Sequence, residues 1–184
     1  MEIKELEEIV DNTILQHDYP GFEPRSLNLA LPQAVNDSPA RLYVEALKSK
    51  NVYVQLVGLR WFQMRPGAAK NHSQIIATQL DNIDPWVRLE AIRTIEIAKL
   101  WEDNSILKVT ALLKDAEENV RMEAAKACGC LSKDIKKTPK NQALSLEEHI
   151  IAALKEASRD KSESVRRKAI KSLRKLGAYF SEAS

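Results

Sequence analysis

The chain is poor in the residues that most β-rich folds use for tight turns and sheet packing. Its 184 residues include five glycines and seven prolines, and aromatic residues make up only 5% of it. A β-sandwich needs more β-branched and aromatic residues and more glycine turns. Alanine, leucine, isoleucine, lysine and glutamate are abundant instead, and these residues lose little freedom in a helix. The composition therefore predicts an all-α fold.

Cysteines and long apolar runs are also scarce. Cys128 and Cys130 are too close for an unstrained disulfide within one helix and too few for a disulfide scaffold. No stretch of about 18 apolar residues exists, so we expect no membrane span. The sequence MEIKELEEIVDN lacks the basic and apolar regions of a signal peptide. We therefore expect a cytoplasmic protein.

The net charge of +2 hides an uneven distribution along the chain. Residues 1–20 carry six acids and one base, whereas residues 133–175 carry thirteen bases and six acids. Two interpretations stay open. The charged ends are solvated caps of a larger structure, or the basic end is a surface for an acidic partner.

An internal repeat organises the chain. The segments 84–95, 118–129 and 163–174 each place a valine before an arginine and an alanine four residues after the valine, and 52–62 is a weaker copy. The four core valines are Val54, Val87, Val120 and Val165. Their spacings are 33, 33 and 45 residues. We place the longer spacing in an inter-repeat loop insertion over the polar residues 132–145.

Each repeat predicts two helices. Counted from the core valine, positions 0, +4, +5 and +8 are apolar or small in every copy, which is one face of a helix. The small residue at +4 lets a neighbouring helix approach closely. The first helices of the pairs are predicted over 39–49, 73–81, 104–114 and 145–158. Such short helices bury their apolar faces only by stacking on one another.

Polar residues recur at the turn between the two helices. An aspartate or asparagine precedes an arginine by six residues in three repeats: Asn82 and Arg88, Asp115 and Arg121, Asp160 and Arg166. The short carboxylate suits the start of a helix, and the arginine can reach acids and carbonyl groups of adjacent turns. We expect these groups to form a structural ladder along the stack.

The aspartate–arginine spacing, the V-R-x-x-A core and the 33-residue period resemble HEAT repeats, most closely the short bacterial type named for phycobilisome lyases. The resemblance covers residues 38–177 and implies an α-α superhelix of about four helix pairs, at 38–66, 70–99, 103–132 and 145–177. The first copy departs from it, with Gln55 for arginine and Ser49 for aspartate. Residues 1–37 predict an irregular helical cap broken at Asp11, Asn12 and the prolines, and 178–184 a tail.

Residues suited to catalysis or metal binding do not cluster. His17, His72 and His149 lie far apart and match no metal-binding spacing. Cys128 falls at the +8 core position, which favours packing, and Cys130 lies near the end of its helix. There is no glycine-rich phosphate loop. We therefore predict no catalytic residues, no bound metal and no cofactor.

The position six residues after each core valine is basic in every repeat: Arg60, Arg93, Lys126 and Lys171. In the family that the chain resembles, the second helices line the concave surface, so these cations are candidates for partner binding. The alternative is that they pair with Glu90 and Glu123 as i,i+3 neighbours. If Trp61 is exposed beside them, it is the best candidate for an aromatic anchor.

Three functions are compatible with these features. The first is a non-enzymatic scaffold or adaptor that binds an acidic protein through the concave face. The second, from the resemblance alone, is a phycobilisome-related factor: a bilin lyase or a subunit that handles phycobiliproteins. The third is nucleic-acid binding through the basic helix at 163–175, which the low net charge and missing aromatic residues disfavour. The sequence does not indicate an oligomeric state.

Overall fold

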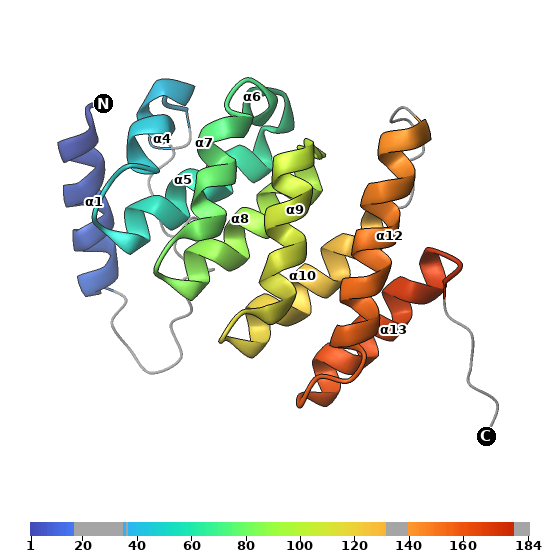
Figure 1. Ribbon diagram of the computed structural model, residues 1–184. Helices are drawn as coiled ribbons and strands as arrows, with labels where there is room; N and C mark the ends of the chain where they lie inside the picture. The colour runs from blue at the N-terminus through green and yellow to red at the C-terminus, as the bar shows by residue number, and fades with distance from the viewer. Residues whose placement is uncertain (17–34, 36, 132–139, 179–184) are drawn as a thin grey trace. The chain divides into compact units, whose positions relative to one another are not determined.

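The computed structural model describes residues 1–16, 35, 37–131 and 140–178 (Figure 1). This part of the chain consists of helices and their connections and contains no strand, which confirms the all-α prediction. The chain divides into two compact units, Met1–Ala98 and Lys99–Ser184, which are taken separately below. None of the described helices is long and apolar enough to cross a membrane.

The first unit opens with one continuous helix, α1 (Ile3–Gln16). The prediction that Asp11 and Asn12 break this segment is wrong. Both residues are only mildly unfavourable inside a helix, by less than about 1 kcal/mol. Burial outweighs this, because Leu6 and Val10 are fully buried on a face one helical turn apart. The helix packs against α4 and α5 within this unit.

Two helix pairs follow α1 in the first unit. The first pair consists of α4 (Ala40–Ala46) and α5 (Val52–Met64). The second pair consists of α7 (Ser73–Thr78), which the 3₁₀ turn η2 (Gln79–Asp81) extends, and α8 (Pro85–Ala98). The first and second helices of each pair contact each other, and α5 also packs along α8. A short helix that the sequence did not predict, α6 (Pro66–Lys70), joins the pairs. It starts at Pro66, because proline at the first helical position lacks only an N–H that no helical carbonyl needs.

The second unit also contains two helix pairs. The first consists of α9 (Asp103–Ala111), which the 3₁₀ turn η3 (Leu112–Lys114) extends, and α10 (Glu118–Cys130). The second consists of α12 (Lys140–Ala157) and α13 (Glu163–Lys175). The contact between α10 and α13 is the largest between helices of this unit. The predicted loop over 132–145 is wrong for its second half, since residues 140–145 belong to α12. Its remaining residues, 132–139, lie outside the described chain.

The predicted core face of the second helices is confirmed with one exception. Positions 0, +4, +5 and +8 are buried in α5, α8 and α10. Gly58 at +4 shows why the position is small: a Cβ there would lie 3.2 Å from the Tyr43 carbonyl oxygen of α4. In α13 only Ile170, at +5, is half-buried. The corresponding Ala125 of α10 is covered by α13, so the exception marks the uncovered side of α13.

Candidate functional site

The turns between paired helices share one chemistry. We call the residue five before each core valine the turn residue: Ser49, Asn82, Asp115 and Asp160. Each side-chain oxygen accepts a hydrogen bond from the backbone N–H two residues later, at 2.8–3.1 Å. Such local bonds fix a turn at the start of the second helix.

The residue after each core valine holds the same turn from the other side. We call it the donor residue: Gln55, Arg88, Arg121 and Arg166. Gln55 donates to the carbonyl of its own turn residue at 2.7 Å. Each arginine donates through Nη1 to the carbonyls of its turn residue and of the next residue, at 2.8–3.0 Å. The contact therefore recurs in each of these helix pairs, including the one that lacks arginine.

Donor and turn residues also link successive helix pairs within each unit. In the second unit Arg121 binds both carboxylate oxygens of Asp160, with Nε at 2.8 Å and Nη2 at 3.1 Å. This hydrogen bonding raises the pKa of Arg121 and lowers the pKa of Asp160, so the pair stays charged at neutral pH. In the first unit Asn82 donates to the Gln55 side chain at 3.2 Å. The departure at Gln55 thus leaves a link in place and changes it from an ion pair to an amide pair.

Helix α1 covers the N-terminal end of this set of contacts. Ser49 donates through Oγ to Glu7 at 2.6 Å, and Asn51 donates to Asp11 at 2.8 Å. Two of the acidic side chains near the chain start therefore have a structural role. They accept hydrogen bonds from two side chains of the turn between α4 and α5.

A second link joins the second helices along their length. The Thr94 hydroxyl, at position +7 of α8, donates to the Glu90 carbonyl of its own helix at 2.7 Å and lies 3.4 Å from the Leu59 carbonyl oxygen of α5. Ser172, at +7 of α13, donates to the Ala125 carbonyl of α10 at 2.6 Å. Sequence reasoning missed both hydroxyls, although their shared position relative to the core valine was a usable signal. Gly129 permits the second contact, since a Cβ there would lie 2.3 Å from Ser172 Oγ.

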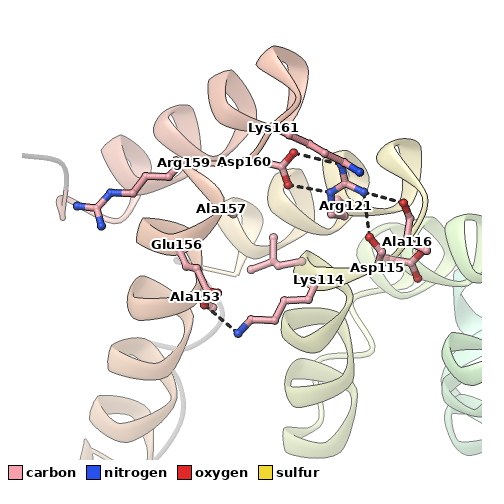
Figure 2. Close-up of a pocket in the computed structure, with 11 residues that line it drawn as sticks. Lys114, Asp115, Ala116, Arg121, Ala153, Glu156, Ala157, Arg159, Asp160 and Lys161 are labelled. Carbon is pink, nitrogen blue, oxygen red and sulfur yellow. Dashed lines mark hydrogen bonds and ion pairs between the residues drawn. The ribbon is translucent and has the colours of Figure 1, made fainter.

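A pocket of about 430 Å³ lies beside the Arg121–Asp160 pair in the second unit (Figure 2). Leu113, Ala153 and Ala157 contribute its apolar wall. An exposed ion pair between Lys114 and Glu156, 2.9 Å apart, lies across it. The residues found to line it include no serine, threonine, cysteine or histidine. The pocket is therefore lined by charged side chains, most of them paired, and by none of the hydroxyl, thiol or imidazole groups that serine, threonine, cysteine or histidine would supply.

The basic residues at +6 in the first unit are held by a buried acid. Glu90 is only 3% exposed and lies 3.5 Å from Arg60 and 2.9 Å from Arg93. Gln63 donates to the same carboxylate at 2.8 Å. Arg60 itself is buried, at 8% exposure. The expectation of an open cation row is therefore wrong for Arg60, because its charge stabilises a buried carboxylate; Arg93 is half-buried in the same cluster.

Trp61 is likewise a core residue, which rules out its expected role as an exposed anchor. Its indole is 4% exposed. The ring stacks on Tyr43 with centroids 4.3 Å apart and meets the edge of Phe62 at 5.2 Å. The Arg65 guanidinium lies 4.5 Å from the ring centroid. The indole therefore fills the space between α4 and α5.

The two +6 cations of the second unit differ from each other in their surroundings. Lys126 pairs with the buried Glu123 at 2.7 Å, as the pairing alternative predicted. In α13 the residue at +3 is Lys168, so Lys171 has no carboxylate one turn before it. The Lys171 side chain is exposed and makes no hydrogen bond or ion pair with any residue whose side chain the structure describes.

Helix α13 departs from the other second helices at further positions. Its residues at +2, +3, +9 and +10 are all cations, whereas those positions hold apolar, acidic or uncharged residues in every other repeat. The α13 residues are Arg167, Lys168, Arg174 and Lys175. With Arg166 and Lys171 they give six cations against one acid, Glu163, over the helix. We call these six residues the α13 cationic surface.

Reactive groups elsewhere are few in the described chain. Cys128 is fully buried 4.0 Å from the Thr110 hydroxyl, and burial raises the pKa of its thiol to about 12. Cys130 is half-buried. His72 is half-buried near Phe62, His149 is exposed, and His17 lies outside the described residues. No group of three His, Cys, Asp or Glu side chains in the described part could hold a metal ion.

No family model matches the chain, and no curated protein matches its sequence.

Proposed function

We propose that the chain is a HEAT-like α-α superhelix of about four helix pairs that acts as a non-enzymatic scaffold. In this proposal the α13 cationic surface binds an acidic segment of a protein partner. The recurrence of the turn and donor contacts in every repeat supports the fold. So does the +7 hydroxyl contact, which occurs once in each unit. A stack of such repeats offers an extended surface on which exposed side chains determine the partner.

One observation carries the choice of surface. Buried carboxylates at +3 neutralise the +6 cations of α8 and α10, and α13 replaces that carboxylate with Lys168. A terminal helix needs a polar outer face for solubility, but both signs of charge would meet that need. A surface of one sign instead attracts and orients a partner of the opposite sign.

An acidic protein segment suits this surface better than a nucleic acid does. Single-strand binding proteins combine cations with aromatic side chains on which bases stack. Helix α13 contains no aromatic residue. The whole chain also carries a net charge of only +2, below what general affinity for nucleic acids requires.

The test uses the full chain and a fluorescein-labelled peptide of alternating glutamate and glycine, followed by fluorescence anisotropy. We expect binding that weakens as salt rises. The variant K168Q/K171Q should lower affinity roughly fivefold, on the order of 1 kcal/mol, because it removes one half-buried and one exposed cation.

The matched control K50Q/K70Q removes the same charge from exposed lysines of the first unit and should leave binding unchanged. Equal loss in both variants would show that only net charge matters, which contradicts the proposal. A peptide of alternating glutamine and glycine must not bind. Tighter binding of single-stranded DNA than of the acidic peptide would favour the nucleic-acid function instead.

A further inference from the structure

The start of α10 recognises a three-residue turn of the next repeat. Arg121 holds the Asp160 carboxylate in a two-pronged contact. Three residues before Arg121, the Glu118 carboxylate accepts a hydrogen bond from Ser162 at 2.6 Å. The bound turn therefore has the sequence Asp-x-Ser, and its aspartate also accepts the Ser162 backbone N–H at 2.8 Å.

The start of α13 presents the same two groups in the same register. Glu163 and Arg166 lie two residues before and one residue after Val165, as Glu118 and Arg121 do relative to Val120. Arg166 is fixed as Arg121 is, by Nη1 hydrogen bonds of 2.8 and 3.0 Å to two carbonyl oxygens of its own turn. Two backbone acceptors thus orient the guanidinium before any ligand arrives.

The edge of Arg166 that corresponds to the aspartate-binding edge of Arg121 is open. Arg166 is half-buried, and its Nε and Nη2 donate to no residue whose side chain the structure describes. Glu163 meets Arg167 at 3.7 Å, with both side chains more than 70% exposed. Such an exposed pair contributes little free energy and is readily exchanged for a ligand hydroxyl.

This side of α13 lacks the small residue with which α10 admits its neighbouring helix. Gly129 of α10 lets Ser172 approach, whereas the corresponding residue of α13 is Arg174, and Met122 is replaced by Arg167. A helix placed against α13 as α13 lies against α10 would meet these two cations. Compared with α10, α13 therefore retains the polar groups that bind a turn and lacks the small residue that lets a helix pack closely.

We propose that Glu163 and Arg166 form a binding site for an Asp-x-Ser segment of another protein. The aspartate carboxylate takes the Nε and Nη2 edge of Arg166, and the serine hydroxyl donates to Glu163. A surrounding positive charge favours an otherwise acidic segment. The site shares Arg166 and the class of partner with the proposed function, but unlike that function it depends on shape as well as charge.

The test is an NMR titration of the ¹⁵N-labelled full chain with the peptide Gly-Asp-Gly-Ser-Glu-Gly. We expect the Arg166 Nε–H resonance to move, because a carboxylate hydrogen bond deshields that proton. Replacing the peptide's aspartate with asparagine should weaken binding about tenfold, or about 1.4 kcal/mol. The scrambled peptide Gly-Ser-Gly-Asp-Glu-Gly keeps the charge and should bind as weakly as the asparagine peptide.

The variant R166Q tests the protein side without removing the turn contact. Gln55 shows that glutamine at this position still donates to its turn carbonyl, at 2.7 Å. We expect R166Q to fold, to lose about tenfold in affinity for the aspartate peptide, and to bind the asparagine peptide as the unaltered chain does. R166K, which keeps the charge without the planar fork, should lose most of the same affinity.

Equal binding of the aspartate and scrambled peptides would overturn this site, even if K168Q/K171Q still weakens the binding of longer acidic peptides. If K168Q/K171Q leaves the binding of longer acidic peptides unchanged while the Asp-x-Ser preference persists, only the proposed function is overturned. Concentration-dependent self-association that R166Q abolishes would assign the site to a second copy of the chain and overturn the peptide assignment.

Discussion

At the scale of single residues, the Arg121–Asp160 pair and the Gln55–Asn82 pair perform the same structural task with different charge. Each joins a donor residue to the turn residue of the next helix pair. The first has the stronger hydrogen bonds, because both partners are ionised. Removing one partner of the ion pair also costs more stability than removing one partner of the amide pair, because it leaves the other charge half-buried and unpaired.

We therefore expect R121Q and D160N each to destabilise the chain by about 2 kcal/mol. The double variant R121Q/D160N recreates the pairing of Gln55 with Asn82 and should lose clearly less than the sum of the two. Urea denaturation of the four proteins measures this coupling. Strict additivity would mean that the pair contributes nothing as a pair.

The same pair predicts how stability changes with acid. Because Arg121 lowers the pKa of Asp160 in the folded state, the pair's stabilisation is present above the ordinary aspartate pKa of about 3.9. It is lost as pH falls from there through the lowered folded pKa. The stability difference between the unaltered chain and D160N should therefore be constant at neutral pH and shrink at strongly acidic pH. A difference that grows on acidification would contradict the assignment.

The two cysteines give a residue-scale prediction about reactivity. Cys128 is buried and the pKa of its thiol is raised to about 12, so almost no thiolate is present at neutral pH. We expect a thiol reagent to modify the native chain only at the half-buried Cys130, and both cysteines after unfolding. C130S should abolish native labelling and C128S should preserve it. Rapid native labelling of C130S would show that the third repeat opens.

At the scale of helices, the sequence predicted what depends on local periodicity. The core valine and its +4, +5 and +8 positions located every second helix, because a 3.6-residue period is visible in one segment alone. The start of α12 and the continuity of α1 were missed. In both, polar residues suggested a break, and buried apolar residues on the same helix outweighed them.

Contacts between helix pairs were harder to predict, because they depend on which residues the packing of neighbouring helices brings together. The sequence predicted that Arg121 and Asp160 belong to a ladder. It did not predict that Gln55 makes the corresponding hydrogen bonds, to the Ser49 carbonyl and with Asn82. It proposed the +6 cations as one row and did not reveal that Glu90 is buried between two of them. Burial of an acid depends on the neighbouring helix, which no single repeat encodes.

The contact of α10 with α13 gives an element-scale prediction on glycine. G129A would place a Cβ 2.9 Å from the Ser172 Cα atom, so the two helices must separate. We expect a loss of about 1–3 kcal/mol in unfolding free energy. The matched substitution G67A, in the short helix α6, meets nothing within 4 Å and should stabilise the chain by about 0.5–1 kcal/mol. Thermal or urea unfolding distinguishes the two, and a neutral G129A would mean that the helices are less tightly packed than described.

At the scale of the whole molecule, the basic residues divide into a structural set and an exposed set. In the first unit, Arg60 and Arg93 compensate the buried carboxylate of Glu90. On α13, Lys168 and Lys171 have no such acid within their own helix. Reversing the charge of all +6 residues in one variant would therefore impair folding as well as binding, and the two effects could not be distinguished. The two sets must be tested in separate variants.

We expect R60Q/R93Q to lower the free energy of unfolding by about 3 kcal/mol, because it leaves Glu90 ionised and buried with only its amide partner. Adding E90Q should restore much of the loss, since the uncompensated charge is then removed. K168Q/K171Q removes the same number of charges from exposed or half-buried positions and should change stability by less than about 0.5 kcal/mol. Urea denaturation measures all three, and peptide anisotropy on the same samples reports binding. Equal destabilisation by the two pairs would make the α13 lysines structural and would leave the α13 cationic surface without a separate role in binding.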